Sequence, residues 1–375
     1  MKKGRAKKLL GICIFLMGLM IFSVLPVQAA APRMYTIQPG KTWTRYDITG
    51  DGKKDRIKVV RKKSQYDGCW NGADIYVNNT KACAINKAFM DMSIRIITDS
   101  ASDMSPTEHP ALRVLPLSVT FGTDVYMDGI DIDHQRFYEM LVERDELPKT
   151  GQVNPYAFSQ AIAEAREAGD EAVIITVGAK LSGTNQSART ALAEAPGGDV
   201  YVVDSNNVTL GERVLVEYAL RLVDEGRSAA QIATAVEAVR DRVVVIGLLE
   251  TLEYLVRGGR LSAAAGAVGT LLNVKPVVAA EDGLIVQLGK ARGSKNGRNL
   301  LNQKVEQAGG VDFSMPLALG YTGLSDAVLK KYIEDSAALW AGHAENELPI
   351  HTIGATIGTH VGPGAVAVAF FRPAN

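Results

Sequence analysis

The stretch LSGTNQSA, at residues 181–188, holds hydroxyl and glycine residues suited to chemistry. It follows an apolar run at 172–177 and precedes a helical pattern. A strand, a small polar turn and a helix are how α/β proteins usually build an anion site. Ser182 could be a nucleophile, part of a phosphate cradle or a hydrogen-bond donor. It lacks the flanking pattern of a nucleophile elbow, and the sequence has neither a Walker A motif nor a dinucleotide fingerprint.

Polar residues gather in four segments where predicted strands end. Ligands of open parallel sheets bind beside the carboxyl ends of the strands, so these segments are expected to converge. Each segment alone is also typical of a helix N-cap, for which Ser100, Asn154 and Ser182 are candidates. The four together favour a binding site. They are TDSASD (98–103), KTGQVNP (149–155), LSGT (181–184) and DSNNVT (204–209).

Among the five histidines, only His360 occupies a glycine-rich segment, IGTHVGPG, of the kind that approaches a ligand. Residue spacing assigns no catalytic base to Ser182. Residues 93–375 contain no cysteine and no His, Asp or Glu cluster with metal-ligand spacing. Thiol catalysis and a cysteine-ligated metal are therefore excluded for this part of the chain, and we expect no cofactor.

Basic residues follow two predicted elements. In LEYLVRGGRLS, Gly258 and Gly259 turn the chain after a helix, and Arg260 follows. Arginines beside a turn suit a carboxylate or phosphate, although a helix C-cap with dipole-compensating cations has the same pattern. The segment KARGSKNGR (290–298) adds a basic cluster that includes Arg292. In an acidic domain this cluster indicates an anionic partner.

The segment SAAAGAVGTLLNVKP (262–276) is small and apolar, with no charge before Lys275. A buried helix against a sheet has this composition. Small side chains would equally leave room for an apolar ligand between two lobes, because ligand pockets are mostly apolar.

The arrangement of apolar segments predicts a two-lobe α/β protein. Strands and amphipathic helices alternate from residue 94, which predicts a parallel sheet with flanking helices in a first lobe, 93–250. An Asp282–Gly283 hairpin and further strands predict an α+β lobe with a mixed sheet at 251–375. Predicted strands cover 94–98, 113–119, 172–177, 200–204, 243–249, 316–323, 350–358 and 364–371, and predicted helices cover 133–144, 155–168, 187–194, 211–225, 229–239 and 325–341.

Charge divides the chain of 375 residues into two parts. Residues 1–92 carry 17 Lys and Arg against 6 Asp and Glu, and residues 93–375 carry 24 against 35. The acidic larger part excludes nucleic acid as a general partner, because phosphate binding needs a basic face.

The N-terminal 92 residues have the pattern of an exported extension. Residues 1–30 combine a basic start, an apolar run and small residues near Ala29, which is typical of a secretory signal peptide; a transmembrane anchor is the alternative. Residues 31–92 form a small β-rich module of secreted type. Its Cys69 and Cys83 could form a disulfide outside the cytoplasm.

The module contains a partial calcium-loop pattern. Asp47, Thr49, Asp51 and Asp55 occupy positions 1, 3, 5 and 9 of such a loop. Position 12 is Lys58 instead of the usual glutamate, so a plain Asp/Gly turn between strands fits equally well.

Eight motifs in register resemble the DegV family, whose members include the fatty-acid-binding subunits of bacterial fatty acid kinase. They are IITDSASDM, TGQVNP, LSGTNQSA, VVDS, LEYLVRGGRLS, LLNVKPVV, KAR and IGTHVGPGAVAVAF, between Ile94 and Phe371. The resemblance implies a two-lobe protein that encloses a fatty-acid tail between its lobes. It also implies a partner kinase subunit that binds ATP and phosphorylates the presented carboxylate, so that this chain does no chemistry itself.

The resemblance assigns roles to particular residues. It implies that Thr150 and Ser182 hold the carboxylate, with His360 nearby, and that Arg260 and Arg292 contact the phosphorylated head group or the kinase. Burying a carboxylate costs free energy unless it accepts hydrogen bonds, and neutral hydroxyl groups can donate them. The other residues expected in the pocket and its turns are Asp99, Ser100, Gly183, Thr184, Gly258, Gly259 and Gly362.

The sequence also departs from the family. Gly151 and Val153 replace the Ser and Pro of the family's T-S-Q-P, which removes a donor, and Tyr321 stands where members often carry His. The DegV part is expected in the cytoplasm, whereas the signal peptide argues for export, out of reach of an ATP-dependent partner. The alternatives are an exported lipid-binding or carrier protein and a serine hydrolase using Ser182 with His360.

Overall fold

The chain divides into two units in the computed structural model, Met1–Met92 and Ser93–Asn375. The described part of the first unit contains strands, and the second unit contains strands and helices. The structure describes residues 42–46, 55–63, 70–77, 80–86, 93–144, 146–261, 273–343 and 348–374.

The first unit contains a four-stranded antiparallel sheet. Neighbours in sequence are neighbours in the sheet, in the order β1-β2-β3-β4. The four strands lie within residues 31–92, for which the sequence predicts a small β-rich module of secreted type. The strands are β1 (Thr42–Tyr46), β2 (Asp55–Lys63), β3 (Trp70–Val77) and β4 (Thr80–Asn86).

Three predictions for the first unit lie partly or wholly outside the described residues. The signal peptide at 1–30 is one of them. The calcium loop is described only at Asp55, the first residue of β2, and the disulfide only at Cys83, within β4. The undescribed residues are Asp47, Thr49, Asp51 and Cys69.

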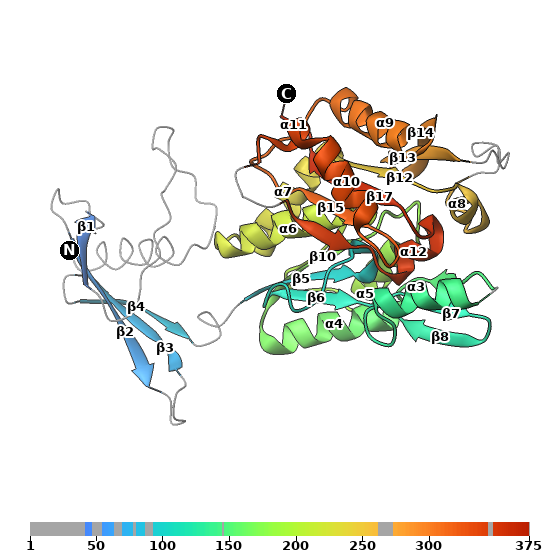
Figure 1. Ribbon diagram of the computed structural model, residues 1–375. Coiled ribbons are helices and arrows are strands. Elements are labelled where there is room, and N and C mark those ends of the chain that lie inside the picture. Colours follow the sequence, from blue (N-terminus) through green and yellow to red (C-terminus); the bar gives the residue numbers. More distant parts are fainter. Residues whose placement is uncertain are drawn as a thin grey trace. The chain divides into compact units, whose positions relative to one another are not determined.

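The second unit begins with a lobe built on a parallel sheet. Its main elements are β5 (Ile94–Asp99), β6 (Leu112–Leu115), α4 (Pro155–Ala168), β10 (Glu171–Thr176), α5 (Thr184–Glu194), β11 (Val200–Asp204), α6 (Leu210–Asp224) and α7 (Ala229–Val239). The strands are parallel and ordered β11-β10-β5-β6. In Figure 1, α4 and α5 lie on one face of this sheet and α6 and α7 on the other. Side chains such as Ile97 and Ile174 are therefore fully buried, as expected of a parallel sheet covered on both faces.

A small antiparallel sheet flanks this lobe, ordered β8-β7-β9. Strands β7 and β8 precede helix α3 in the chain, and β9 follows it. The elements are β7 (Ser118–Phe121), β8 (Asp124–Met127), α3 (His134–Glu143) and β9 (Lys149–Gly151). α3 packs on β7 through Phe121 and Phe137, whose ring centroids lie 5.9 Å apart.

The C-terminal lobe is built on a six-stranded mixed sheet. Its elements are β12 (Val243–Leu248), α8 (Glu253–Arg257), β13 (Val274–Glu281), β14 (Leu284–Arg292), α9 (Ser294–Gln307), β15 (Ala318–Tyr321), α10 (Ala327–Asp335), α11 (Ala337–Trp340), β16 (Ile350–Thr352), α12 (Ala355–Val361) and β17 (Val366–Phe371). The strand order is β14-β13-β12-β17-β15-β16, and β15 and β16 are parallel. α6 contacts strands of both large sheets and lies between them (Figure 1). The predicted two-lobe α/β fold, with one parallel and one mixed sheet, is confirmed.

Three predicted elements differ from the structure. The sequence places 243–249 in the first lobe, but β12 pairs with β13 and β17 in the mixed sheet. That placement is wrong because an apolar run does not reveal which of two buried sheets it joins. The predicted strand 113–119 is two strands in different sheets, separated by Pro116, which has no N–H for a ladder. The predicted helix 325–341 is interrupted at Ser336.

The segment around His360 also differs from its prediction. Residues 350–358 are predicted as a strand, but β16 ends at Thr352 and helix α12 begins at Ala355. His360 lies in the last turn of this helix and not in a glycine-rich loop. Two glycines flank this short helix, since Gly354 is its N-cap and Gly362 its C-cap, and Gly358 lies within it.

Although α12 lies between β16 and β17 of the C-terminal lobe in sequence, it packs against the first lobe. It contacts α3, β7, β9 and the short 3-10 helix η1 (Ser100–Ser102). Gly358 permits this approach, since a Cβ there would lie 2.5 Å from Cε1 of Phe137 and from Oη of Tyr138. Close packing at one glycine thus joins the two lobes.

We expect the substitution Gly358→Ala to lower the free energy of unfolding by about 1–3 kcal/mol, the usual cost of overpacking. In an uncrowded helix the same change is stabilising, so the sign reports the contact with Phe137 and Tyr138. Urea unfolding followed by circular dichroism measures it. A variant as stable as the wild type, or more stable, would show that α12 does not pack closely on α3.

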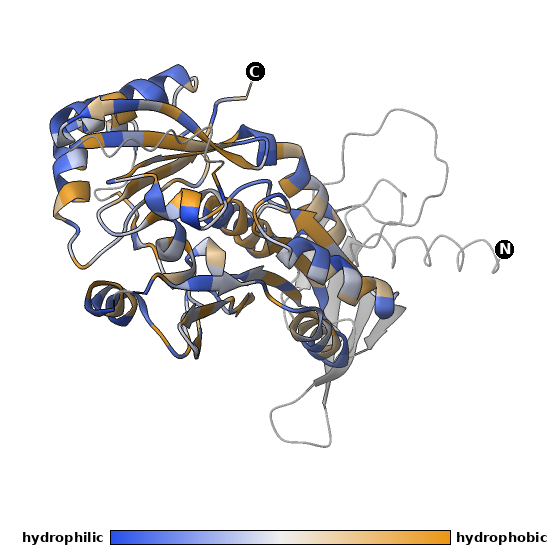
Figure 2. Ribbon diagram, turned by 90° about the vertical axis from the view of Figure 1, so that its right-hand side faces the viewer, coloured by the Kyte–Doolittle hydropathy of each residue, from blue (hydrophilic) through white to orange (hydrophobic). Residues whose placement is uncertain are grey.

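Figure 2 shows strands dominated by apolar residues beside helices that carry both hydrophilic and hydrophobic residues. This distribution is expected when a hydrophobic core lies between the sheets and the helices that cover them. Within the ranges that the structure describes, no helix has the length and apolar character needed to cross a membrane.

Candidate functional site

A cavity of about 420 Å³ lies between the two lobes of the second unit. This volume is in the range of small-molecule sites. One wall is the inner face of the mixed sheet, where Val245 and Gly247 of β12 and Ala367 of β17 leave space because they are short. The predicted apolar segment 262–276 is described only from residue 273. Further apolar lining residues include Val177, Leu181, Val208, Val278, Ile285 and Ile357.

Polar residues of both lobes meet at the cavity. Thr150 comes from β9 and His360 from α12, and Thr150 Oγ1 lies 2.9 Å from His360 Nε2. Ser182 follows Leu181, whose carbonyl oxygen accepts a hydrogen bond of 3.1 Å from Arg260 Nε. All four polar residues line the cavity. The four polar segments also converge as predicted, since each supplies a lining residue: Ala101, Thr150, Ser182 and Thr209. We call Thr150, Ser182, Arg260 and His360 the polar cluster.

His360 is neutral at physiological pH. Burial, with a smaller contribution from the Arg260 charge, lowers the pKa of the imidazole to about 4. Among the described residues, Nδ1 is buried without a hydrogen-bond partner. An orphaned acceptor is less costly than an orphaned N–H donor, so the proton belongs on Nε2, which donates to Thr150 Oγ1. The Thr150 hydroxyl then keeps its own proton to donate into the cavity.

The LSGT turn positions Ser182 beside this donor. Ser182 Oγ lies 2.9 Å from Thr184 Oγ1 and accepts a weak hydrogen bond of 3.3 Å from the Thr184 amide. Thr184 Oγ1 in turn accepts from the Val153 amide. The turn and the Thr150 strand are therefore held together, which brings their two hydroxyl groups to one cavity.

Arg260 brings a positive charge to the cavity. Its Nη1 donates to the Gly258 carbonyl oxygen over 2.7 Å, and its Nε donates to Leu181. No carboxylate forms an ion pair with it in the part of the chain that the structure describes. Burial lowers the pKa of the guanidinium from its usual value, but arginine stays charged. The cluster thus carries a cation that an anionic ligand could neutralise.

Asp99 and Ser100 support the cavity wall instead of facing a ligand. The Asp99 carboxylate accepts from the amides of Ala101 and Val177, both of which line the cavity. Burial raises the pKa of Asp99 to about 7. Ser100 Oγ accepts from the Leu117 amide over 3.0 Å. Asp99 and Ser100 therefore do not line the cavity themselves but hold residues that do.

The predicted glycines have different surroundings. Gly183 lines the cavity, and a Cβ there would overlap the Gln152 amide. A Cβ on Gly258 would overlap Nδ1 of His360, so this glycine leaves room for the imidazole. Gly362 packs on the ring of Tyr254. Gly259 has a positive φ of 70° and turns the chain.

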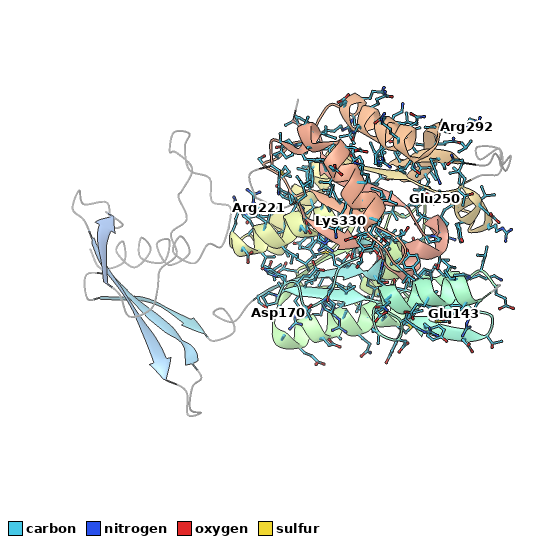
Figure 3. The ribbon with its side chains drawn as sticks, viewed as in Figure 1. Glu143, Asp170, Arg221, Glu250, Arg292 and Lys330 are labelled. Carbon is cyan, nitrogen blue, oxygen red and sulfur yellow. The ribbon has the colours of Figure 1, made fainter. Side chains whose placement is uncertain are left out.

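Arg292 does not line the cavity. It is the last residue of β14 and is exposed to solvent. Figure 3 shows it on the outside of the molecule, beyond Glu250. The structure therefore does not bring it into the polar cluster, which leaves a role in partner contact as a prediction.

Gln152 is a cavity residue that the sequence patterns do not single out. Its Nε2 donates to Ser187 Oγ over 2.9 Å, and its amide packs against Gly183. This bond connects the Thr150 strand to α5. Its place in the TGQVNP motif is the signal that could have identified it.

The described residues do not form a hydrolase triad. Ser182 Oγ is paired with Thr184, whereas Nε2 of His360 is paired with Thr150. No carboxylate contacts His360 Nδ1 in the described ranges, where a triad needs its orienting acid. Nor does any group of three or more His, Cys, Asp or Glu in those ranges suit a metal ion.

The fold and site define a two-lobe binding protein with an apolar cavity and a polar cluster. Residues 93–373 match the family model described as "Uncharacterised protein, DegV family". A DegV domain-containing protein of Deinococcus radiodurans is 35% identical over 287 residues, which cover 74% of this chain and 98% of that relative. The chain belongs to the DegV family, as its motifs predict.

Solved structures of the family have the same fold. A Thermus thermophilus DegV protein, described as fatty-acid-binding, is 31% identical, with a TM-score of 0.66 over 75% of this chain and 100% of that one. A stearic-acid-binding protein of Eubacterium ventriosum is 25% identical, with a TM-score of 0.66 over 74% and 98%. The compared structures thus include proteins with bound fatty acids.

The depressed pKa of His360 predicts a pH-dependent stability. The unfolded state takes up a proton near pH 6.5 and the folded state only near pH 4, so this residue costs stability as the pH falls between those values. Between pH 7.5 and pH 5, we expect the wild type to lose about 2 kcal/mol more unfolding free energy than His360→Gln. Urea titrations of both proteins at the two pH values measure this. Equal losses of unfolding free energy in the two proteins would show that the pKa of His360 is not lowered in the folded state.

Proposed function

We propose that the second unit binds a long-chain fatty acid in its interlobe cavity, with the carboxylate at the polar cluster and the tail along the mixed sheet. The observation that carries this proposal is one cavity with apolar walls and with hydroxyl donors beside Arg260, which forms no ion pair with a carboxylate among the described residues. The fatty-acid binding described for the Thermus thermophilus and Eubacterium ventriosum relatives supports it.

The polar cluster matches a carboxylate. A carboxylate only accepts hydrogen bonds, and the cluster offers the hydroxyls of Thr150 and Ser182 and the guanidinium of Arg260. Hydrogen bonds to a charged acceptor are worth about 1.5–3 kcal/mol each. Among the described residues that line the cavity, there is no Asp or Glu that would repel the ligand.

The apolar walls match an acyl tail. Burying about 16 methylenes at about 0.8 kcal/mol each gives about 13 kcal/mol of gross transfer free energy. Association entropy and ordering of the chain offset several kcal/mol of this. The remainder exceeds the cost of desolvating one hydrogen-bonded carboxylate, so an acyl chain of this length is expected to bind tightly.

We expect Thr150→Val to weaken stearate binding about 10- to 100-fold, because the isosteric change removes one hydroxyl donor to a charged acceptor. Isothermal titration calorimetry on delipidated protein measures the affinity. The matched control is Thr234→Val, since Thr234 is an exposed helix residue whose hydroxyl donates to the Ala230 carbonyl oxygen. The stearate affinity of the Thr234→Val variant should equal that of the wild type.

Mass spectrometry of organic extracts tests the proposal without added ligand. The purified wild type should carry close to one fatty acid per chain. Repeated preparations with no fatty acid, together with no stearate binding by calorimetry, would overturn the proposal. Ester hydrolysis that Ser182→Ala abolishes would instead support the hydrolase alternative.

We further propose that the chain is a substrate-presenting subunit, whose bound carboxylate is phosphorylated by an ATP-dependent kinase partner in the cytoplasm. Lys290, Arg292 and Lys295 are exposed at and after the end of β14 and offer a basic surface for that contact. The rival proposal is an exported lipid carrier, which the signal-peptide pattern at residues 1–30 favours.

Fractionation of the source cells with an antibody against the second unit separates these two proposals. A substrate-presenting subunit should be found in the cytoplasmic fraction, and adding ATP and a fatty acid kinase subunit should yield acyl phosphate. An N-terminally processed chain outside the cytoplasm, with no acyl phosphate formed, would favour the carrier.

A further inference from the structure

The start of α12 is held by side chains of the other lobe. Gly354, its N-cap, supplies no side-chain hydrogen bond. The Gly354 amide instead donates to Asp103 Oδ1 over 2.8 Å, and the amides of Ala355 and Thr356 donate to Asp128 over 3.3 and 3.1 Å. The lobe that carries Thr150 thus also anchors the helix that carries His360.

Asp103 has further contacts that fix its own position. It follows η1 with a left-handed φ of 55°, a conformation that few non-glycine residues adopt. Its Oδ2 accepts from the Thr209 hydroxyl over 2.6 Å, and its carbonyl oxygen accepts from Arg213 Nη1 over 2.8 Å. Thr209 lines the cavity and directly precedes α6. One residue therefore connects η1, α6, the cavity wall and α12.

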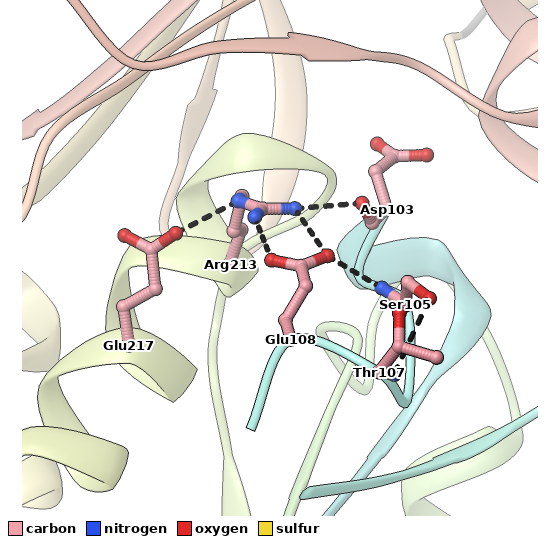
Figure 4. Close-up of polar contacts among 6 residues, drawn as sticks. All are labelled: Asp103, Ser105, Thr107, Glu108, Arg213 and Glu217. Atoms are coloured by element: carbon pink, nitrogen blue, oxygen red, sulfur yellow. Dashed lines mark hydrogen bonds and ion pairs between the residues drawn. The ribbon is translucent and has the colours of Figure 1, made fainter.

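Arg213 is itself held firmly. Its side chain is only 3% exposed and forms ion pairs with Glu108 and Glu217. Figure 4 shows the guanidinium between these two carboxylates, with one nitrogen directed at the Asp103 backbone. Glu108 also accepts from the Ser105 amide, which closes the loop that follows Asp103. The backbone of Asp103 is thus fixed independently of α12.

We infer that Asp103 is a positioning residue for ligand binding: by holding Gly354 and Thr209 it sets α12 so that His360 reaches Thr150. This inference rests on the proposed fatty-acid site. Asp103 itself does not line the cavity. It acts through α12, in which His360 lies six residues after Gly354. A shift of the helix start therefore moves the imidazole.

The test is the substitution Asp103→Asn at pH 8, above the pKa of about 7 to which burial raises Asp103; it keeps the shape of the side chain but removes its charge and one acceptor. We expect the Kd for stearate to rise at least about tenfold, the usual scale for a hydrogen bond to a charged group. In the His360→Gln background the same substitution should have little effect on the Kd, because Asp103 acts on binding through His360, which that variant lacks. The matched control is Asp170→Asn, since Asp170 accepts from Ser93 and Arg95 away from α12.

A second readout needs no ligand. The side-chain ¹⁵N resonances of His360 report its tautomer and its bond to Thr150, and we expect Asp103→Asn to shift them in the delipidated protein while Asp170→Asn leaves them in place. If Asp103→Asn fails to fold, Thr209→Val removes a donor to the same carboxylate and should give the same dependence on His360 with a smaller change in Kd.

The outcomes separate the two proposals. Unchanged His360 resonances in Asp103→Asn, or an equal loss of affinity with and without His360, would overturn the positioning role. Absence of stearate binding in the wild type would overturn the proposed function, and the resonances would still decide the role of Asp103.

Discussion

The hydrogen bond between Thr150 and His360 joins the two lobes at the cavity, and the site depends on it. Thr150 lies on β9 of the first lobe, and His360 lies on α12, which connects β16 and β17 of the mixed sheet. The bond forms because Gly358 lets α12 approach α3 and because Gly258 leaves room for the imidazole. Burial then keeps the imidazole neutral, so that it orients the Thr150 hydroxyl as a donor without adding charge.

Acidic and basic groups have separate tasks around the cavity. Asp99, Asp103 and Asp128 accept backbone amides and hold loops and α12, and burial raises the pKa of Asp99 and of Asp103 to about 7. Removing these carboxylates from water costs free energy. Their hydrogen bonds hold the backbone in place, so they serve the fold and not the ligand. The lining itself presents hydroxyls and Arg260, which suit an anionic head group. The same lobe junction therefore stabilises the fold and sets the polarity of the site.

Sequence patterns predicted what depends on local order and on the topology of parallel sheets. The bounds of α4 and α7 are those expected, and the loops after β5, β10 and β11 converge because the carboxyl ends of these parallel strands share one edge. Thr150 instead comes from β9 of the small antiparallel sheet. Patterns could not show that β12 joins the mixed sheet, since both sheets bury apolar runs. Nor could they show that α12 is a helix capped by Asp103, because that capping joins residues 251 positions apart.

The proposed function depends on a fatty acid in the interlobe cavity with its carboxylate at the polar cluster. A crystal structure of the second unit with stearate tests this most directly. We expect a carboxylate within hydrogen-bond distance of the Thr150 and Ser182 hydroxyls and a tail along β12 and β17. Stearate bound elsewhere, or with its methyl end at Thr150, would show that this arrangement is wrong.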